Sequence, residues 1–296
     1  MSDTVIKTKQ LTKKYGKQTV VNKVNLNVKK GRIYGLLGRN GAGKTTIMKM
    51  ILGLTTTTSG NVEVFGKNID GNEKRIYSRI GAIIETPGFY PNLTGTENLE
   101  IFAKLRGTAS PNAVKHALEV VGLPYKDKKT FAKYSLGMKQ RLGIANAILH
   151  DPELLILDEP TNGLDPIGIA EVRDFIKKLS VEHGKTILIS SHILSEIAVL
   201  ADDIGIIDKG VLLEESSMSE LEKRNRKYIS LQVSDIPKTI LILERQFHVK
   251  DYSVQDEQTV QIYDTTLNMG EVNKALVMED ITVISSGLCN DTLEDY

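Results

Sequence analysis

Continuous apolar runs and amphipathic stretches alternate along the first two thirds of the chain. Ile33–Leu37 is apolar throughout, and two further runs follow at Leu154–Leu157 and Thr186–Ser190. Runs of this kind are typical of parallel strands that are buried on both faces of a sheet. Residues 167–179 lie between the last two runs and have helical spacing. The pattern therefore predicts an α/β domain with helices on both faces of a parallel sheet.

The first 65 residues have the pattern of a β-rich segment. Val5–Thr8 is followed by a turn signal at Gly16 and then by Val24–Val28, in which apolar and polar residues alternate strictly. Strict alternation predicts one half-buried strand over this last stretch.

Helical spacing dominates from Glu97 to Leu149, where Pro111 is expected at the start of one helix. This indicates a helical subdomain over about residues 86–150. We place it within a first domain of residues 1–220.

Shorter elements follow the basic cluster at residues 223–227. The expected order is strand, helix, strand, strand, helix and strand, over Tyr228–Val233, Pro237–Phe247, Lys250–Gln255, Gln258–Tyr263, Asn268–Glu279 and Ile281–Ser286. This βαββαβ order is that of a ferredoxin-like sandwich. We expect residues 221–296 to form a small α+β accessory domain, in which no motif indicates a particular chemistry.

Charge is nearly balanced over the chain, with 38 basic and 37 acidic residues, but it is unevenly distributed. Residues 1–50 contain 12 basic residues and a single acid, Asp3. Such a field would attract a polyphosphate, although a solvated basic face that binds nothing has the same composition. No apolar run approaches the roughly 18 residues that span a bilayer, and the N-terminus lacks a signal pattern. We therefore expect a cytoplasmic protein.

A glycine-rich loop follows the apolar run Ile33–Leu37 and precedes a helix expected over Thr45–Leu52. The loop consists of Gly38, Arg39, Asn40, Gly41, Ala42, Gly43, Lys44, Thr45 and Thr46. Its glycines allow φ > 0 and bring backbone N–H groups onto a phosphate. Lys44 supplies a charge for the β- and γ-phosphates, and Thr45 offers a hydroxyl to Mg²⁺. Strand, loop and helix in this order predict a nucleoside triphosphate site.

Two carboxylates and a histidine follow predicted strands. Asp158 and Glu159 come directly after Leu154–Leu157, and His192 comes after the next strand. Ligands of open α/β sheets bind at the carboxyl ends of the strands. Asp158 is suited to hold the water shell of Mg²⁺, and Glu159 to polarise an attacking water as general base. His192 is placed to hydrogen-bond the γ-phosphate, whereas alone it would be an ordinary loop residue.

Tyr134–Gln140 contains a second candidate phosphate site, which has no loop lysine of its own. The Ser135 hydroxyl and the Gly137 N–H lie at the start of a helix expected over residues 139–149. The unpaired N–H groups and the dipole of a helix start favour an anion. A chain that brings two phosphate elements to one ATP is most simply a head-to-tail pair of domains. Dimerisation is therefore expected to be part of the mechanism.

Two further residues allow more than one interpretation. Tyr15 precedes the Gly16 turn, and its ring either stacks on adenine or packs within the domain. Asp165 lies in a polar turn after Glu159 and is most simply a helix cap.

Together these motifs resemble the ATP-binding subunit of ABC transporters, over about residues 5–220. The resemblance implies a P-loop NTPase fold with Walker A at Gly38–Thr46, Walker B at Leu154–Asp158 and a signature at Ser135–Gln140. The signature, with Ser135, Gly137 and Gln140, would contact nucleotide across the dimer.

The same resemblance assigns a role to each remaining candidate. Tyr15 would stack on adenine, and Glu159 would be the catalytic carboxylate. Asp165 would be the D-loop acid, and His192 the switch histidine. The expected cofactors are ATP and Mg²⁺. The expected partners are a second copy of the chain and a separate permease, which would hold the homodimer at the inner face of the cell membrane. No nucleic acid is expected.

The chain departs from the family pattern at two places. Tyr134, Leu136 and Met138 stand at signature positions that usually hold other residues, and Glu85 stands where the Q-loop normally has a glutamine that coordinates Mg²⁺. We expect the carboxylate to remain a metal ligand. Glu85, the loop after it and the short C-terminal domain are similar to the bacitracin-type and lantibiotic-immunity branch. Subunits of that branch pair with a separate permease to expel peptide antibiotics.

Two other classes of protein share part of these features. A soluble ABC ATPase of translation normally has two cassettes in one chain, and one of DNA repair has a long coiled coil between Walker A and the signature. Here one cassette is present, and only 90 residues separate Lys44 from Tyr134. An antibiotic-sensing module with little turnover shares every motif, and ATPase measurements with and without permease would separate it.

Overall fold

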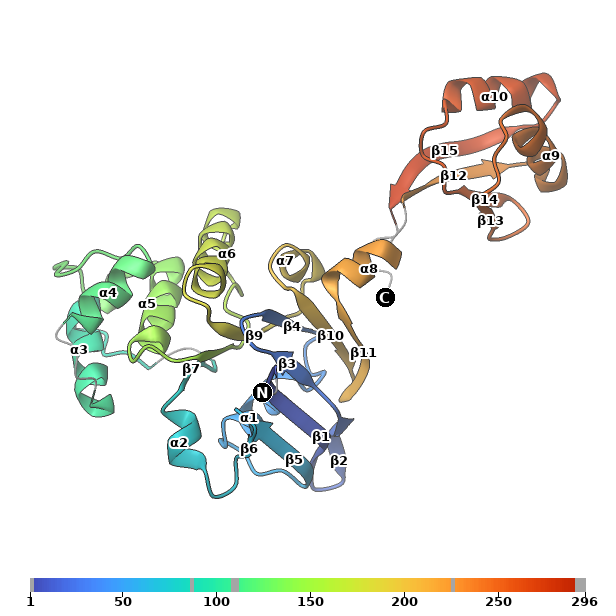
Figure 1. Ribbon diagram of the computed structural model, residues 1–296. Helices are drawn as coiled ribbons and strands as arrows, with labels where there is room; N and C mark the ends of the chain where they lie inside the picture. The colour runs from blue at the N-terminus through green and yellow to red at the C-terminus, as the bar shows by residue number, and fades with distance from the viewer. Residues whose placement is uncertain (1–2, 86–87, 108–111, 225–226, 291–296) are drawn as a thin grey trace. The chain divides into compact units, whose positions relative to one another are not determined.

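The chain divides into two compact units, Met1–Met218 and Ser219–Tyr296 (Figure 1). The computed structural model describes residues 3–85, 88–107, 112–224 and 227–290, so Pro111 lies outside the described residues. The division falls two residues before the boundary expected from the sequence.

An antiparallel sheet in the order β2-β1-β5-β6 forms the N-terminal part of the first unit, and β3 also pairs with β1. Its strands are β1 (Thr4–Tyr15), β2 (Gln18–Val24), β3 (Asn27–Lys29), β5 (Ser59–Val64) and β6 (Lys67–Asn68).

The single strand expected over Val24–Val28 is wrong, because β2 ends at Val24 and β3 begins at Asn27. Thr8 of β1 occupies the break: its Oγ1 donates to the Val24 carbonyl at 2.9 Å and accepts from the Leu26 N–H at 2.8 Å. The apolar alternation persists, since Val24, Leu26 and Val28 are all buried. Periodicity thus predicts the buried face but not the residue at which β1 changes its partner.

A second sheet has the order β11-β10-β4-β9-β8-β7. Its strands are β4 (Ile33–Leu37), β7 (Ile80–Ile83), β8 (Leu154–Leu157), β9 (Thr186–Ser191), β10 (Asp203–Asp208) and β11 (Val211–Ser217). All neighbours are parallel except β10 and β11. The three predicted apolar runs form β4, β9 and β8, which are buried along their whole length. Their carboxyl ends therefore meet at one edge of the sheet.

Helices cover this sheet and form a separate group beside β7. The helices of the first unit are α1 (Lys44–Ile51), α2 (Glu73–Tyr77), α3 (Gly95–Arg106), α4 (Ala113–Val120), α5 (Leu136–Ile148), α6 (Pro166–Val181) and α7 (Leu194–Ala198), and α8 (Met218–Arg224) follows. Figure 1 shows α3, α4 and α5 packed together. Within the described ranges, no helix is both long and apolar enough to cross a bilayer.

One apolar cluster joins the two sheets of the first unit. Ile47, Met48 and Ile51 of α1 have no exposed surface and pack in the same cluster as Ile6 of β1 and Leu36 of β4. Burial of each such side chain contributes about 1.5–3 kcal/mol. The cluster fixes α1, and with it the loop before α1, at the carboxyl end of β4.

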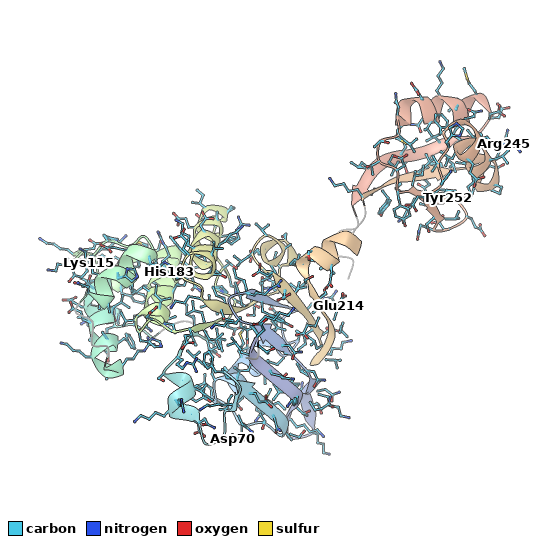
Figure 2. The ribbon with its side chains drawn as sticks, viewed as in Figure 1. Asp70, Lys115, His183, Glu214, Arg245 and Tyr252 are labelled. Atoms are coloured by element: carbon cyan, nitrogen blue, oxygen red, sulfur yellow. The ribbon has the colours of Figure 1, made fainter. Side chains whose placement is uncertain are left out.

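The second unit has the predicted βαββαβ order. Its elements are β12 (Lys227–Val233), α9 (Ile236–Gln246), β13 (Tyr252–Val254), β14 (Thr259–Ile262), α10 (Met269–Met278) and β15 (Val283–Asn290). The sheet order is β13-β14-β12-β15. A core of its own includes Ile229, Leu231 and Val260. Tyr252, labelled in Figure 2, donates its hydroxyl to Glu244 of α9 at 2.7 Å, which ties β13 to the helix layer.

Candidate functional site

The glycine-rich loop between β4 and α1 wraps around the ammonium of Lys44. Lys44 Nζ donates to the Gly38 carbonyl at 2.6 Å and to the Arg39 carbonyl at 3.2 Å. Gly41 and Gly43 have φ of 83° and 107°, a region that glycine enters without strain. A Cβ on Gly43 would lie 2.9 Å from the Val20 carbonyl oxygen. The loop thus takes a conformation that glycine permits and other residues would not.

The same loop lines a small cavity at the start of α1. The cavity has a volume of about 150 Å³ and is lined by Val20, Asn40, Gly41, Ala42, Gly43, Lys44, Thr45, Thr46 and Glu159. Backbone N–H groups at a helix start, together with a lysine, form a site for phosphate. All of these residues except Val20 are among the candidates predicted from the sequence.

Asp158 and Glu159 are positioned by a serine of the neighbouring strand. Leu157 of β8 pairs with Ile189 of β9, so Asp158 is level with Ser190. Ser190 Oγ donates to Asp158 Oδ1 at 2.6 Å and accepts from the Glu159 N–H at 2.9 Å. Ser190 is fully buried, so both bonds are shielded from water. The motifs do not predict Ser190; its signal is a hydroxyl at the end of an apolar strand beside the one that carries the acids.

Thr45 and Asp158 bring two oxygen donors together. Thr45 Oγ1 donates to Asp158 Oδ2 at 2.7 Å. Hydroxyl and carboxylate oxygens are the ligands that Mg²⁺ prefers, and Mg²⁺ is usually held by one or two carboxylates together with waters and substrate phosphates. Across residues 3–85, 88–107, 112–224 and 227–290, no group of three or more His, Cys, Asp and Glu side chains could hold a metal alone. The donor set therefore fits Mg²⁺ that arrives with a nucleotide.

Glu159 lies between a cation and a histidine. Its Oε1 is 3.1 Å from Lys44 Nζ, and its Oε2 is 2.7 Å from His192 Nδ1. Its φ of 44° lies in the left-handed region, which costs a non-glycine residue about 1–3 kcal/mol. Such strain is typical of functional sites. The three predicted residues Lys44, Glu159 and His192 thus form one connected group.

Glu85 is paired with a lysine of α1. Its Oε1 accepts from Lys49 Nζ at 2.7 Å, and its side chain is 68% exposed. The hydrogen bond from Lys49, and then the charge of Lys49, lower the pKa of the Glu85 carboxyl. Glu85 is therefore held ionised by a lysine of α1. The motifs do not predict Lys49, although a basic residue in the last turn of a helix is the signal that would draw attention to it.

The signature segment forms the start of α5. Ser135 is the N-cap, and its Oγ accepts from the Met138 N–H at 3.2 Å, so the helix begins at Leu136, earlier than expected. A Cβ on Gly137 would have its nearest neighbour 3.9 Å away, on Leu164. Leu136 is 51% exposed. Gln140 lies on the same helix. The segment therefore presents a helix start, an open glycine and an apolar side chain to its surroundings.

Asp165 and Tyr15 lie at the ends of elements. The Gly168 N–H donates to Asp165 Oδ1 at 2.8 Å, which confirms that Asp165 caps α6. Tyr15 ends β1 with 52% of its surface exposed, and Lys13 Nζ lies 4.9 Å from the centre of its ring. The ring is thus accessible for stacking.

A larger cavity of the first unit lies away from these residues. It has a volume of about 970 Å³, and its lining includes Lys115 and His183, labelled in Figure 2, together with His116 and His150. The rings of His116 and His183 lie 6.3 Å apart. None of the predicted site residues lines it. The candidate site is therefore identified by its chemistry and not by the size of its cavity.

Four features define a P-loop nucleotide-binding ATPase: strand β4, the glycine loop after it, the lysine at the start of α1 and the acids after β8. The ABC transporter family profile matches residues 21–162. The chain is 58% identical to the bacitracin transport ATP-binding protein BcrA of Enterococcus faecalis, over 99% of this chain and 94% of that protein. The chain therefore belongs to the ABC transporter ATP-binding proteins.

Two other similarities agree with this assignment. The chain is 48% identical to the lantibiotic transport ATP-binding protein SrtF of Streptococcus pyogenes, over 71% of this chain and 90% of that protein. The dimeric structure of MJ0796, a bacterial ABC transporter cassette, superposes with a TM-score of 0.65 at 27% identity, covering 72% of this chain and 98% of that one.

Family membership confirms several predictions from the sequence. The P-loop fold of an ABC cassette, the binding of ATP and its hydrolysis to drive transport are properties of this family. ABC ATP-binding subunits dimerise and work with membrane permease subunits. The alternative of a soluble ATPase of translation or DNA repair is not favoured.

Proposed function

We propose that this chain hydrolyses Mg²⁺-bound ATP and drives a separate permease that exports a peptide antibiotic of the bacitracin or lantibiotic class. The observation that carries the proposal is the extent of the similarity to the bacitracin transport protein. It covers 99% of the chain and so includes the second unit, whereas the family profile ends at residue 162. The protein would lie at the inner face of the cell membrane, held there by its permease.

Each residue of the connected group has a role in this proposal. Lys44 exchanges its loop carbonyls and Glu159 for oxygens of the β- and γ-phosphates. Thr45 and Asp158 would hold the metal ion, with Glu85 as a further ligand, and a bound ion would supply positive charge beside the phosphates. Glu159 accepts a proton from the attacking water. His192 contacts Glu159 through Nδ1, so its other ring nitrogen is available to hydrogen-bond the γ-phosphate.

Residues from both copies of the chain complete each nucleotide site. Tyr15 stacks on adenine in one copy, whose loop Gly38–Thr46 holds the phosphates. Ser135, Gly137 and Gln140 of the second copy contact the γ-phosphate from the start of α5, and Asp165 lies at the same junction. In this proposal, the cassette comprises residues 1–220 with its helical subdomain at about 86–150, and residues 221–296 form an accessory domain.

The test uses the chain with its own permease in proteoliposomes. ATPase activity and accumulation of bacitracin or of a lantibiotic are measured together, with the Lys44→Ala variant as the inactive control. The proposal predicts uptake that depends on ATP and stops in the variant. Turnover that rises with the antibiotic but moves none of it would instead identify a sensing module.

A further inference from the structure

An ion pair joins α1 to the segment after β7. Lys49 Nζ lies 2.7 Å from Glu85 Oε1, with the two side chains 34% and 68% exposed. Lys49 is in the last turn of α1, the helix whose first residue is the phosphate lysine Lys44. Glu85 has φ of 64°, so the chain turns sharply where it meets Lys49. The pair thus connects the phosphate loop to the residue that replaces the family's usual glutamine.

Lys49 lies one turn of α1 after Thr45, whose Oγ1 donates to Asp158 Oδ2 at 2.7 Å, so Lys49 and Thr45 share one face of the helix. The hydrogen bond to Glu85 raises the pKa of Lys49 most, while the charges of Glu85, Asp158 and Tyr15 raise it further.

We propose that Lys49 is a positioning residue that acts through Glu85, a role that rests on the metal site of the proposed function. A carboxylate at this position adds a negative charge next to the triphosphate. The ion pair of Glu85 with Lys49 has no net charge, and the glutamine that is usual in the family is likewise uncharged. Metal and Lys49 compete for the same oxygen, so Lys49 releases Glu85 when Mg²⁺-nucleotide binds and recaptures it when the metal leaves.

The competition predicts two opposite effects of removing the ammonium. In Lys49→Met, Glu85 is an uncompensated anion, so ATP binds more weakly when EDTA removes the metal. The same carboxylate is free for metal, so the Mg²⁺ concentration that supports half of maximal ATP binding falls. Because the ion pair is exposed, we expect roughly a 1.5- to fivefold change in each quantity.

Matched variants separate this role from a structural one. Lys49→Arg keeps the charge and should retain both wild-type values. Lys9→Met removes the lysine from another exposed pair, in which Lys9 Nζ lies 2.8 Å from Glu63 Oε1, and should change neither. In the Glu85→Gln background, Lys49→Met should lower the Mg²⁺ concentration that supports half of maximal ATP binding much less, because no carboxylate is left for metal and ammonium to compete for.

The experiment measures the dissociation constant for ATP by calorimetry, in EDTA and over a Mg²⁺ titration, on the full chain. Thermal melts confirm that each variant is folded. Equal effects of Lys49→Met on the Mg²⁺ requirement in the wild-type and Glu85→Gln backgrounds, or none in either, would overturn the proposal. Failure of the wild-type protein to bind ATP, or retention of binding in Lys44→Ala, would instead contradict the proposed function, so the two failures are distinguishable.

Discussion

Lys44 and Glu159 form a buried ion pair, with 3.1 Å between Nζ and Oε1 and side chains only 4% and 19% exposed. In the proposed function, Lys44 would hold the phosphates and Glu159 would activate water. The structure pairs these two residues with each other. A triphosphate that enters the loop competes with Glu159 for the same ammonium. Removing one partner of a buried pair leaves the other uncompensated, which is strongly destabilising. In the proposed function, nucleotide binding would therefore free Glu159 to act as general base as the nucleotide fills the loop.

Glu159→Gln tests the assignment of the general base. General-base catalysis contributes typically ~10²–10⁴-fold, so hydrolysis should fall by that order while ATP binding persists and the dimer remains closed. Phosphate release and gel filtration with ATP measure the two effects. Glu153→Gln, at the other end of β8 in a surface pair with Arg79, is the matched control and should turn over normally. Wild-type hydrolysis by Glu159→Gln would rule out the assignment.

Ser190→Ala tests the link between the strands. The variant loses the bonds to Asp158 and to the Glu159 N–H, and an unsatisfied buried group costs about 1–3 kcal/mol. A lower Tm is expected, together with a kcat lower by about tenfold, equivalent to ~1.4 kcal/mol. Ser180→Ala, which removes one long bond of 3.4 Å to the Gly31 carbonyl, should change both much less. An unchanged kcat in Ser190→Ala would show that Ser190 does not position the acids.

Mixed dimers test the contribution of the signature across the dimer. A Lys44→Ala subunit paired with a Ser135→Arg subunit leaves one composite site intact, so mixing the two inactive variants should restore some ATP binding and slow turnover. The control pairs Lys44→Ala with the double variant Lys44→Ala/Ser135→Arg, which leaves no intact site. If the first mixture behaves like the control at every ratio, the shared site is wrong or both sites must act together.

The sequence predicts the parts of the site that depend on local chemistry. The loop Gly38–Thr46, the acids after β8 and the cap at Asp165 follow from residue type and spacing, and the apolar runs identify β4, β8 and β9. What it does not predict depends on contacts between distant residues. Ser190 is level with Asp158 only through the register of β8 and β9, and Lys49 meets Glu85 only through the packing of α1.

The strand break at Asn25 and Leu26 has the same origin. Val24, Leu26 and Val28 keep one buried face whether they belong to one strand or two. The hydroxyl of Thr8, on a strand far back in the chain, bonds both sides of the break. Hydrophobic periodicity contains no information on such a bond, so no pattern within residues 24–28 could have predicted it.

Glu85 is the clearest departure from the family pattern, and two substitutions test its role. Glu85→Gln should retain basal ATPase activity but require more Mg²⁺ for half of the maximal rate, because an amide oxygen binds the ion more weakly than a carboxylate. We expect the loop of residues 87–93 to face the permease, so Glu85→Ala should still hydrolyse ATP while antibiotic resistance falls. Mg²⁺ titrations of the ATPase rate and resistance assays in cells that also express the permease measure these effects.

Glu63→Gln, which changes an exposed carboxylate with a lysine partner at 2.8 Å, is the matched control. Unchanged titrations and full resistance in both Glu85 variants would identify Glu85 as a solvated loop acid, and the assignment to the peptide-antibiotic branch would then depend on sequence similarity alone.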